Sequence, residues 1–186
     1  MKPREIIEFA KVIGKLKRTP RTGWGVCGVK NSKSVAEHSF RTTFLAMLFS
    51  DLKGKNDRLV RMALLHDIEE AVTGDIMTME KVKDRKKAEK KAKDGIGKAL
   101  SALPKGLKEK YFKLWNESEQ LKTKDAKLLK QIDYVEQMMQ ALEYEHEQGV
   151  NLEEFWVFME KEFRFTDPLI RKVFEQLKAQ RPKAFK

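Results

Sequence analysis

Cysteine is almost absent from this sequence, in which Cys27 is the only one among 186 residues. A single cysteine excludes an intramolecular disulfide framework and a zinc site built from several thiolates, and it is typical of a reducing compartment. No apolar run reaches the length of about 20 residues that a transmembrane helix needs. The N-terminal stretch MKPREIIEFAK also lacks the apolar core of a signal peptide. We therefore expect a cytoplasmic protein that does not interact with membranes.

The period-two alternation that is typical of half-buried strands is also missing. Apolar residues recur instead at helical spacing, so we predict an all-α fold in one domain spanning residues 1–186. Within it, residues 80–103 would form a lysine-rich helical segment, either a solvated arm or a lid support, and residues 151–186 would form C-terminal helices packed on the core. The predicted helices span roughly residues 3–17, 34–52, 57–74, 80–102, 107–118, 123–148 and 167–180, with a loop at 18–33.

The formal net charge of +11 would suit a protein that binds nucleic acid. Lysine and glutamate are abundant together, however, and this mixture also suits a surface laced with ion pairs. Much of the positive excess lies in residues 80–94, EKVKDRKKAEKKAKD, where no aromatic side chains interleave with the lysines to form a stacking platform. Nucleic-acid binding is therefore the less favoured interpretation of the charge.

Ionisable residues follow an apolar helical face in residues 63–76, ALLHDIEEAVTGDI. Burying such groups is costly unless they are paired or bind a metal, so the stretch either turns abruptly outward or builds a site. His66 and Asp67 could reach one ion from the same helical turn. On a continuous helix Glu70 overhangs both of them. Glu69 is rotated by about 100° from Glu70, and we expect it to face solvent.

Two residues far away in the sequence could complete this site. His38 follows a capping box formed by Ser34 and Glu37, and the positive end of the helix dipole there disfavours imidazolium. A neutral imidazole is what a metal ion requires. Asp133 flanks the apolar stripe of the long helix in KLLKQIDYVEQMMQ. The alternatives are a buried histidine with ordinary hydrogen bonds and a surface carboxylate paired with Lys130.

The four blocks PRTGW, SVAEHS, ALLHDIEEAVTGDI and QIDYVEQ occur in this order. Together they resemble the HD-domain metal-dependent phosphohydrolases, and more closely the YfbR-type 5′-deoxynucleotidases. The resemblance covers Ile6 to about Glu147 and is weakest in the lysine-rich segment. It implies an HD-domain helical bundle, a homodimer, and hydrolysis of nucleoside 5′-monophosphates, with deoxyribonucleotides preferred. Aromatic residues near the C-terminus could belong to a dimer interface or to the core, and core packing is the commoner role.

The resemblance also implies a role for each matching residue. The metal ligands would be His38, His66, Asp67 and Asp133. Glu70 would be the catalytic carboxylate, as an acid or as a base. Arg21 would bind the phosphate and take part in catalysis, and Trp24 would shape the sugar side of the pocket. Asp75 would accept a hydrogen bond from the sugar 3′-hydroxyl.

Two imidazoles and two carboxylates suit one divalent ion, and Mn²⁺, Co²⁺, Zn²⁺ and Ni²⁺ all remain open. Binuclear HD phosphodiesterases generally use further histidines, but only His146 remains in this chain. His146 lies among glutamates at the end of the long helix, where we expect it to be solvated. Arg41 could contact phosphate, but we interpret it as a surface arginine.

Three hypotheses about function follow. The first is a metal-dependent phosphatase that acts on nucleoside 5′-monophosphates. The second is another HD phosphohydrolase, acting on nucleotide di- or triphosphates or on phosphodiesters, for which Lys30 and Lys33 lie near the expected pocket loop. The third is a basic nucleic-acid-binding or scaffold protein with a structural metal site. Glu70 and Arg21 count against the third hypothesis, because a structural site does not need them.

Overall fold

The computed structural model describes residues 1–54, 57–77 and 83–185. The predicted all-α fold is confirmed, because helices dominate these residues and their only β-type pairing is an isolated bridge between Pro20 and Ser34. None of the described helices is long and apolar enough to cross a membrane. The α-helices are α1 Pro3–Lys15, α2 Thr22–Val26, α3 Val35–Leu52, α4 Arg58–Leu65, α5 Glu70–Thr73, α7 Arg85–Ala99, α8 Lys105–Gln120, α9 Lys124–Gln148, α10 Glu153–Glu162 and α11 Pro168–Gln180.

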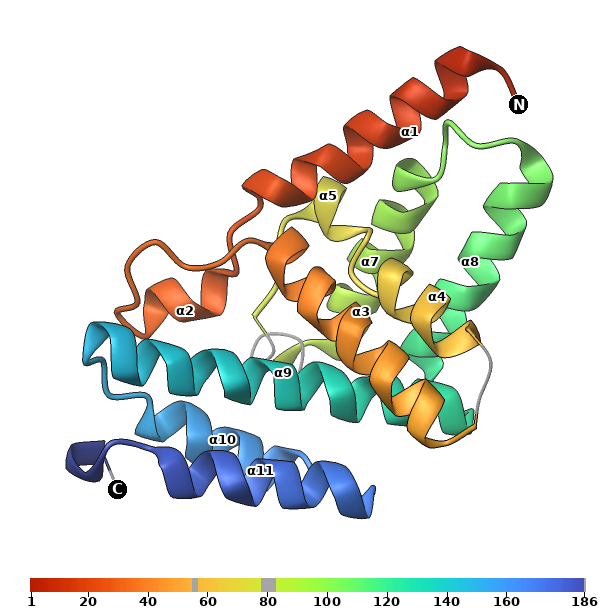
Figure 1. The fold of residues 1–186 in the computed structure, drawn as a ribbon. Helices are drawn as coiled ribbons and strands as arrows, with labels where there is room; N and C mark the ends of the chain where they lie inside the picture. Colours follow the sequence, from red (N-terminus) through yellow and green to blue (C-terminus); the bar gives the residue numbers. More distant parts are fainter. Residues whose placement is uncertain (55–56, 78–82, 186) are drawn as a thin grey trace.

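The long helix α9 forms the centre of the fold (Figure 1). It begins at its cap residue Thr123, whose side chain accepts a hydrogen bond from the Ala126 amide, and it ends at Gly149 in the left-handed conformation. Helix α3 packs on one side of α9, and α10 and α11 lie on the other (Figure 1). Because α9 is covered from several directions, most of its circumference is buried, including polar side chains that an amphipathic surface helix would expose.

The aromatic residues near the C-terminus pack into the main core. Trp156, Phe165 and Phe174 are buried, and partly buried rings surround them, namely Phe155, Phe158 and Phe163. Arg181 closes this end, because its guanidinium donates two hydrogen bonds to the buried Glu145 carboxylate and lies 5.0 Å from the centre of the Trp156 ring. These contacts match core packing, the commoner of the two roles considered for the aromatic residues.

The continuous helix predicted for residues 57–74 is wrong. Helix α4 ends at Leu65, and the chain then continues in tighter turns until α5 begins at Glu70. Here backbone amides donate hydrogen bonds to carbonyl oxygens three residues earlier, as Ile68 N does to Leu65 O at 3.2 Å and Glu70 N to Asp67 O at 3.1 Å. In turns of three residues, successive side chains are rotated further around the axis than in an α-helix. The side chains of residues 66–70 therefore point in directions that differ from those in a continuous helix.

The structure corrects the predicted loop at 18–33 and confirms the helix predicted at 80–102 where the chain is described. The predicted loop at 18–33 contains the short helix α2. The segment predicted as helix at 80–102 appears as α7, starting at Arg85, although its first residues lie outside the described part of the chain. Helix α7 is also not a freely solvated arm. Its buried face carries Gly95, Ile96 and Ala99, and it packs closely against α5.

Candidate metal centre

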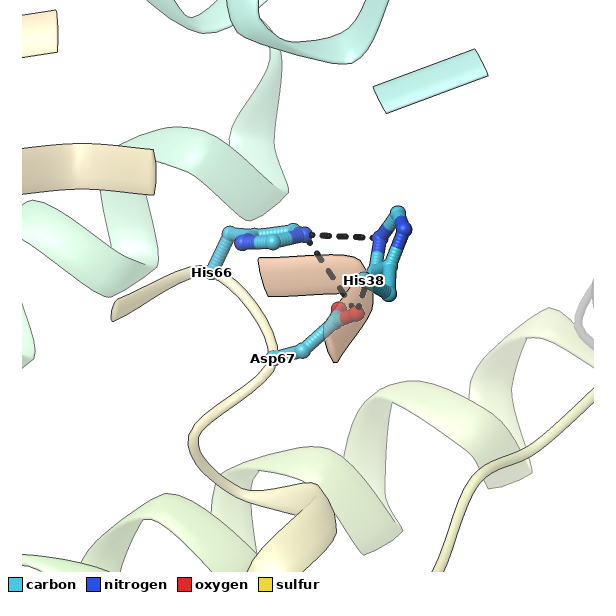
Figure 2. A group of neighbouring side chains, drawn as sticks. All are labelled: His38, His66 and Asp67. Atoms are coloured by element: carbon cyan, nitrogen blue, oxygen red, sulfur yellow. Dashed lines mark hydrogen bonds and ion pairs between the residues drawn. The ribbon is translucent and has the colours of Figure 1, made fainter. Parts of the chain in front are cut away.

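Three side chains from two separate parts of the chain converge in a buried cluster (Figure 2). The Nε2 atoms of His38 and His66 lie 3.4 Å apart. One carboxylate oxygen of Asp67, Oδ2, lies 3.3 Å from His66 Nε2 and 3.6 Å from His38 Nε2. One donor atom from each residue therefore faces a common point, and all three lie within 4.8 Å of one another.

Helix starts and turns bring these residues together. The predicted capping box forms at the start of α3, where the Ser34 hydroxyl accepts from the Glu37 amide at 3.2 Å and the Glu37 carboxylate accepts from the Ser34 amide at 2.7 Å. This cap fixes the first turn of α3, so that His38 points inward. His66 and Asp67 follow the end of α4, where the tight turns present both side chains to the same interior space.

Asp133 lies beside this group, on α9. Its Oδ1 atom is 3.2 Å from His38 Nε2 and accepts a hydrogen bond from Gln137, and its Oδ2 accepts from Lys130 at 2.9 Å. The pairing with Lys130 considered above therefore forms, but Asp133 is buried and not on the surface. Burial raises the pKa of Asp133, yet Lys130 and His38 outweigh it and hold the pKa well below its usual value.

Carboxylates around His38 act against the neutral imidazole that the helix start favours. Burial and Arg21 lower the pKa of His38, but the nearby Glu136 and a hydrogen bond with Asp133 outweigh both and raise it to about 9. The carboxylates on α9 therefore favour positive charge at this position. A divalent cation is favoured by the same carboxylates, and its binding would release the proton.

Arg21 reaches the cluster from the N-cap position of α2. Its Nη1 atom lies 3.1 Å from Asp67 Oδ2 and 3.5 Å from Asp75 Oδ1. Burial lowers the pKa of Arg21, but Asp67 and Asp75 raise it above its usual value, so the guanidinium stays charged. The second oxygen of Asp75, Oδ2, accepts hydrogen bonds from the backbone amide and the hydroxyl of Thr22, which ties the loop after α5 to the start of α2.

Glu70 is buried next to the cluster, and one of its oxygens belongs to a close group with Asp67 and Glu69. The prediction that Glu69 faces solvent is wrong, because Glu69 is only 4% exposed. Its carboxylate accepts a hydrogen bond of 2.8 Å from the Trp115 indole. Helices α7 and α8 cover this side chain, because Trp115 belongs to α8 and a Cβ atom at Gly95 of α7 would lie 3.2 Å from Glu69 Cβ.

Trp24 lies in the main core. It is 5% exposed, and its ring centre lies 5.3 Å from Tyr144 and 4.7 Å from Phe155. Tyr144 is about 16 Å along the axis of α9 from Asp133, at 1.5 Å per residue. The expected pocket-loop lysines, Lys30 and Lys33, also lie toward this end of α9, where they line a cavity of about 460 Å³ with Tyr144.

Arg41 is more than a surface arginine, which corrects another prediction. Its side chain is 29% exposed and makes hydrogen bonds with three acceptors on α9. One acceptor is Glu136, which also contacts His38 Nδ1. His146 is exposed as predicted, with its ring against the Gln180 carbonyl.

Known proteins resemble this chain over most of its length. A model of the HD domain matches residues 13–177. The 5′-deoxynucleotidase HDDC2 of Danio rerio is 34% identical over 166 residues, which cover 88% of this chain and 82% of that protein. The human protein of the same name is 33% identical over 181 residues, covering 96% and 87%. The crystal structure of the PH0347 protein from Pyrococcus horikoshii OT3 covers 94% of this chain and 99% of its own, with a TM-score of 0.76 and 26% identity.

Proposed function

This chain belongs to the HD-domain family, and from that premise we propose that it is a metal-dependent phosphatase. It hydrolyses nucleoside 5′-monophosphates to nucleoside and phosphate. The convergence of His38, His66 and Asp67 on one buried point carries this proposal. The similarity to proteins named 5′-deoxynucleotidase supports the nucleotide substrate and a preference for deoxyribonucleotides.

The donor atoms fit one divalent transition-metal ion. Two imidazole nitrogens and a carboxylate oxygen lie close enough to share an ion, and a second carboxylate flanks His38. The proposed ligands are His38, His66, Asp67 and Asp133. The donor types suit Mn²⁺, Co²⁺, Zn²⁺ or Ni²⁺. When bound, such an ion supplies Lewis acidity and lowers the pKa of a bound water.

Arg21 and Glu70 are the proposed catalytic residues. The guanidinium of Arg21 is already directed at Asp67 in the cluster, and its planar set of donors matches phosphate oxygens. A bound phosphate would take over donors that now face carboxylates. Glu70 is buried beside Asp67, where its carboxyl group can hold a proton for the leaving 5′-oxygen or orient the attacking water.

Asp75 is the proposed acceptor for the sugar 3′-hydroxyl. Thr22 occupies its Oδ2, so the oxygen left for a hydroxyl is Oδ1, which lies 3.5 Å from Arg21 Nη1. An acceptor beside the phosphate-binding guanidinium suits a sugar attached to that phosphate. The proposed contribution of Trp24 to the sugar side is indirect, because its core packing fixes the α2 segment that carries Arg21.

We further propose a homodimer in the cytoplasm. The outer face of α3 carries large exposed apolar side chains, with Phe40 67% and Phe44 53% exposed and their rings 4.9 Å apart. Met47, Leu48 and Leu52 further along α3 are also exposed, and so is Leu64 of α4. Aromatic residues and methionine are enriched in interfaces, and two copies of one face can pair around a two-fold axis. Phe44→Glu should therefore give a monomer by light scattering, whereas Leu169→Glu on the exposed side of α11 should not.

Phosphate release tests the proposed activity. The substrates are dAMP, AMP, dATP and bis(p-nitrophenyl) phosphate, each with Mn²⁺, Co²⁺ or EDTA. Metal-dependent release from dAMP, retained in the exposed-site control Glu175→Ala and lost in Asp67→Ala, is the expected result. Turnover of dATP or the diester alone would assign another HD phosphohydrolase activity. Metal binding without turnover of any substrate would favour a structural metal site.

A further inference from the structure

The two ring nitrogens of His38 point in different directions and meet different partners. Nε2 faces the cluster, 3.2 Å from Asp133 and 3.6 Å from Asp67. Nδ1 makes a hydrogen bond with Glu136 Oε2. Because the two nitrogens lie on opposite sides of the imidazole ring, Glu136 is placed behind His38 and outside the reach of an ion bound at Nε2.

Glu136 is itself held in place by Arg41. The second carboxylate oxygen, Oε1, accepts a hydrogen bond of 2.9 Å from Arg41 Nε. The other guanidinium nitrogens donate to Gln140, at 3.0 Å, and to Glu143. These three acceptors follow one face of α9, and Arg41 lies one turn after His38 on α3. The histidine and its supporting arginine therefore approach the same face of α9 together.

His66 provides an internal comparison. Its Nδ1 lies 2.6 Å from the carbonyl oxygen of Ala63, one turn earlier in the chain. An acceptor at Nδ1 holds the proton there and leaves the Nε2 lone pair for a ligand. Both histidines thus have Nδ1 fixed and Nε2 turned inward, but His66 uses a neutral backbone carbonyl and His38 uses a buried carboxylate.

We propose that Glu136, held by Arg41, is a positioning residue that presents His38 Nε2 to the metal ion. This inference rests on the proposed function, because it assumes that His38 is a ligand. A charged acceptor at Nδ1 fixes the orientation of the ring and makes Nε2 a stronger donor. Glu136 and Arg41 act through His38 and do not touch the substrate.

Zinc affinity tests this proposal directly. Zn²⁺ binding to the full chain is measured by competition with a chromophoric chelator, in wild type, Glu136→Gln and Glu143→Gln. Glu136→Gln keeps the shape of the side chain, but its amide cannot accept from both His38 and Arg41, so we expect zinc affinity to fall by about 10–100-fold. Glu143→Gln is the matched control, because Glu143 also contacts Arg41 but lies outside the bond to His38. Its zinc affinity should equal that of wild type.

A spectroscopic measurement separates positioning from general stabilisation. In the zinc-loaded protein, long-range ¹H–¹⁵N spectra should show His38 protonated at Nδ1 and bound at Nε2. Glu136→Gln should change the Nδ1 signal of His38 and leave that of His66 unchanged. If Glu136→Gln fails to fold by circular dichroism, Arg41→Lys carries the test, since it removes the Nε donor at a partly exposed position and should lower zinc affinity in the same direction.

Equal zinc affinity in wild type and folded Glu136→Gln would overturn this inference and leave the proposed function intact. Equal affinity in wild type and Arg41→Lys would do the same if that variant carries the test. Failure of wild type to bind zinc or any of the other candidate ions would instead overturn the proposed metal site, and this inference with it.

Discussion

Gly95 allows α7 to pack against α5, the short helix that carries Glu70. Replacing Gly95 with alanine should therefore lower both the stability of the fold and the activity. A Cβ atom at this position would lie 2.5 Å from Thr73 Cγ2, 3.2 Å from Glu69 Cβ and 3.3 Å from the Glu69 carbonyl oxygen. Real Cβ atoms essentially never approach a neighbour within 3.0 Å, so something must move. The Thr73 rotamer is restrained because its hydroxyl lies within hydrogen-bond distance of two carbonyl oxygens, those of Gly74 at 2.9 Å and of Glu69 at 3.3 Å.

Gly97 is the matched control, since it lies on the same helix and a Cβ there would meet nothing within 4 Å. Both alanine substitutions gain helix propensity, by about 1 kcal/mol. Only Gly95→Ala also suffers overpacking, which costs about 1–3 kcal/mol. The Gly95 variant should therefore unfold with a free energy about 1–3 kcal/mol below that of Gly97→Ala. At about 2–4 °C per kcal/mol, its Tm should be roughly 2–12 °C lower.

Thermal and urea unfolding of both variants measure this difference. Adding Thr73→Ser to Gly95→Ala should recover part of it, because serine keeps the hydroxyl and removes Cγ2. Phosphatase kcat should also fall in Gly95→Ala and not in Gly97→Ala, since α5 carries Glu70. If Gly95→Ala is as stable as Gly97→Ala, the close approach of α7 and α5 is not what fixes this part of the site.

Three other substitutions test separate contacts. Trp115→Phe removes the indole donor to the buried Glu69 carboxylate, so urea unfolding should show a loss of about 1–3 kcal/mol, and an unchanged midpoint would contradict this role for the bond. Arg21→Lys should lower kcat/KM for dAMP by about tenfold or more, because one charge-assisted hydrogen bond contributes about 1.5–3 kcal/mol and lysine cannot bind phosphate bidentately. Burial raises the pKa of Asp167, but its bonds with Lys53 and the start of α11 outweigh this and lower it from 3.8. Its folded pKa is thus below the unfolded one, and the stability that it adds is present above pH 3.8 and lost as pH falls through the folded pKa. Asp167→Asn keeps the cap without the charge, so the stability difference between wild type and this variant should vanish in that acid window, and a constant difference would refute the assignment.

The cluster residues could be selected from the sequence because buried helical faces predict where an ionisable group is out of place. His66 and Asp67 follow an apolar run, and His38 follows a capping box that the structure reproduces. The outward facing of Glu69 was predicted from an ideal helix, whereas α7 and α8 pack over its side chain in the fold. Such packing between helices that are distant in sequence is not described by the periodicity of one helix.

The sequence contained a pattern that indicates Glu136 and Arg41, the residues behind His38, but reasoning about one residue at a time overlooked it. Arg41 lies three residues after His38, and Glu136 lies three residues after Asp133, so each pair shares a helical face. A contact between the first members therefore leaves the second members within one helical turn of the same crossing, where the long Arg41 side chain reaches Glu136. Trp24 is different, because its packing against Tyr144 depends on how α2 lies on α9, and no local pattern specifies that.

The proposed ligands come from three regions that are far apart in the chain, at residue 38, at residues 66 and 67, and at residue 133. An ion that binds them all prefers the folded chain, because the unfolded chain rarely brings the three regions together. At an ion concentration one hundred times its Kd, this preference adds about 2.7 kcal/mol to the stability of the fold. The population of unfolded chains that proteases can attack would then fall by about one hundredfold. Metal supply in the cell would thus control how long each copy survives as well as whether it is active.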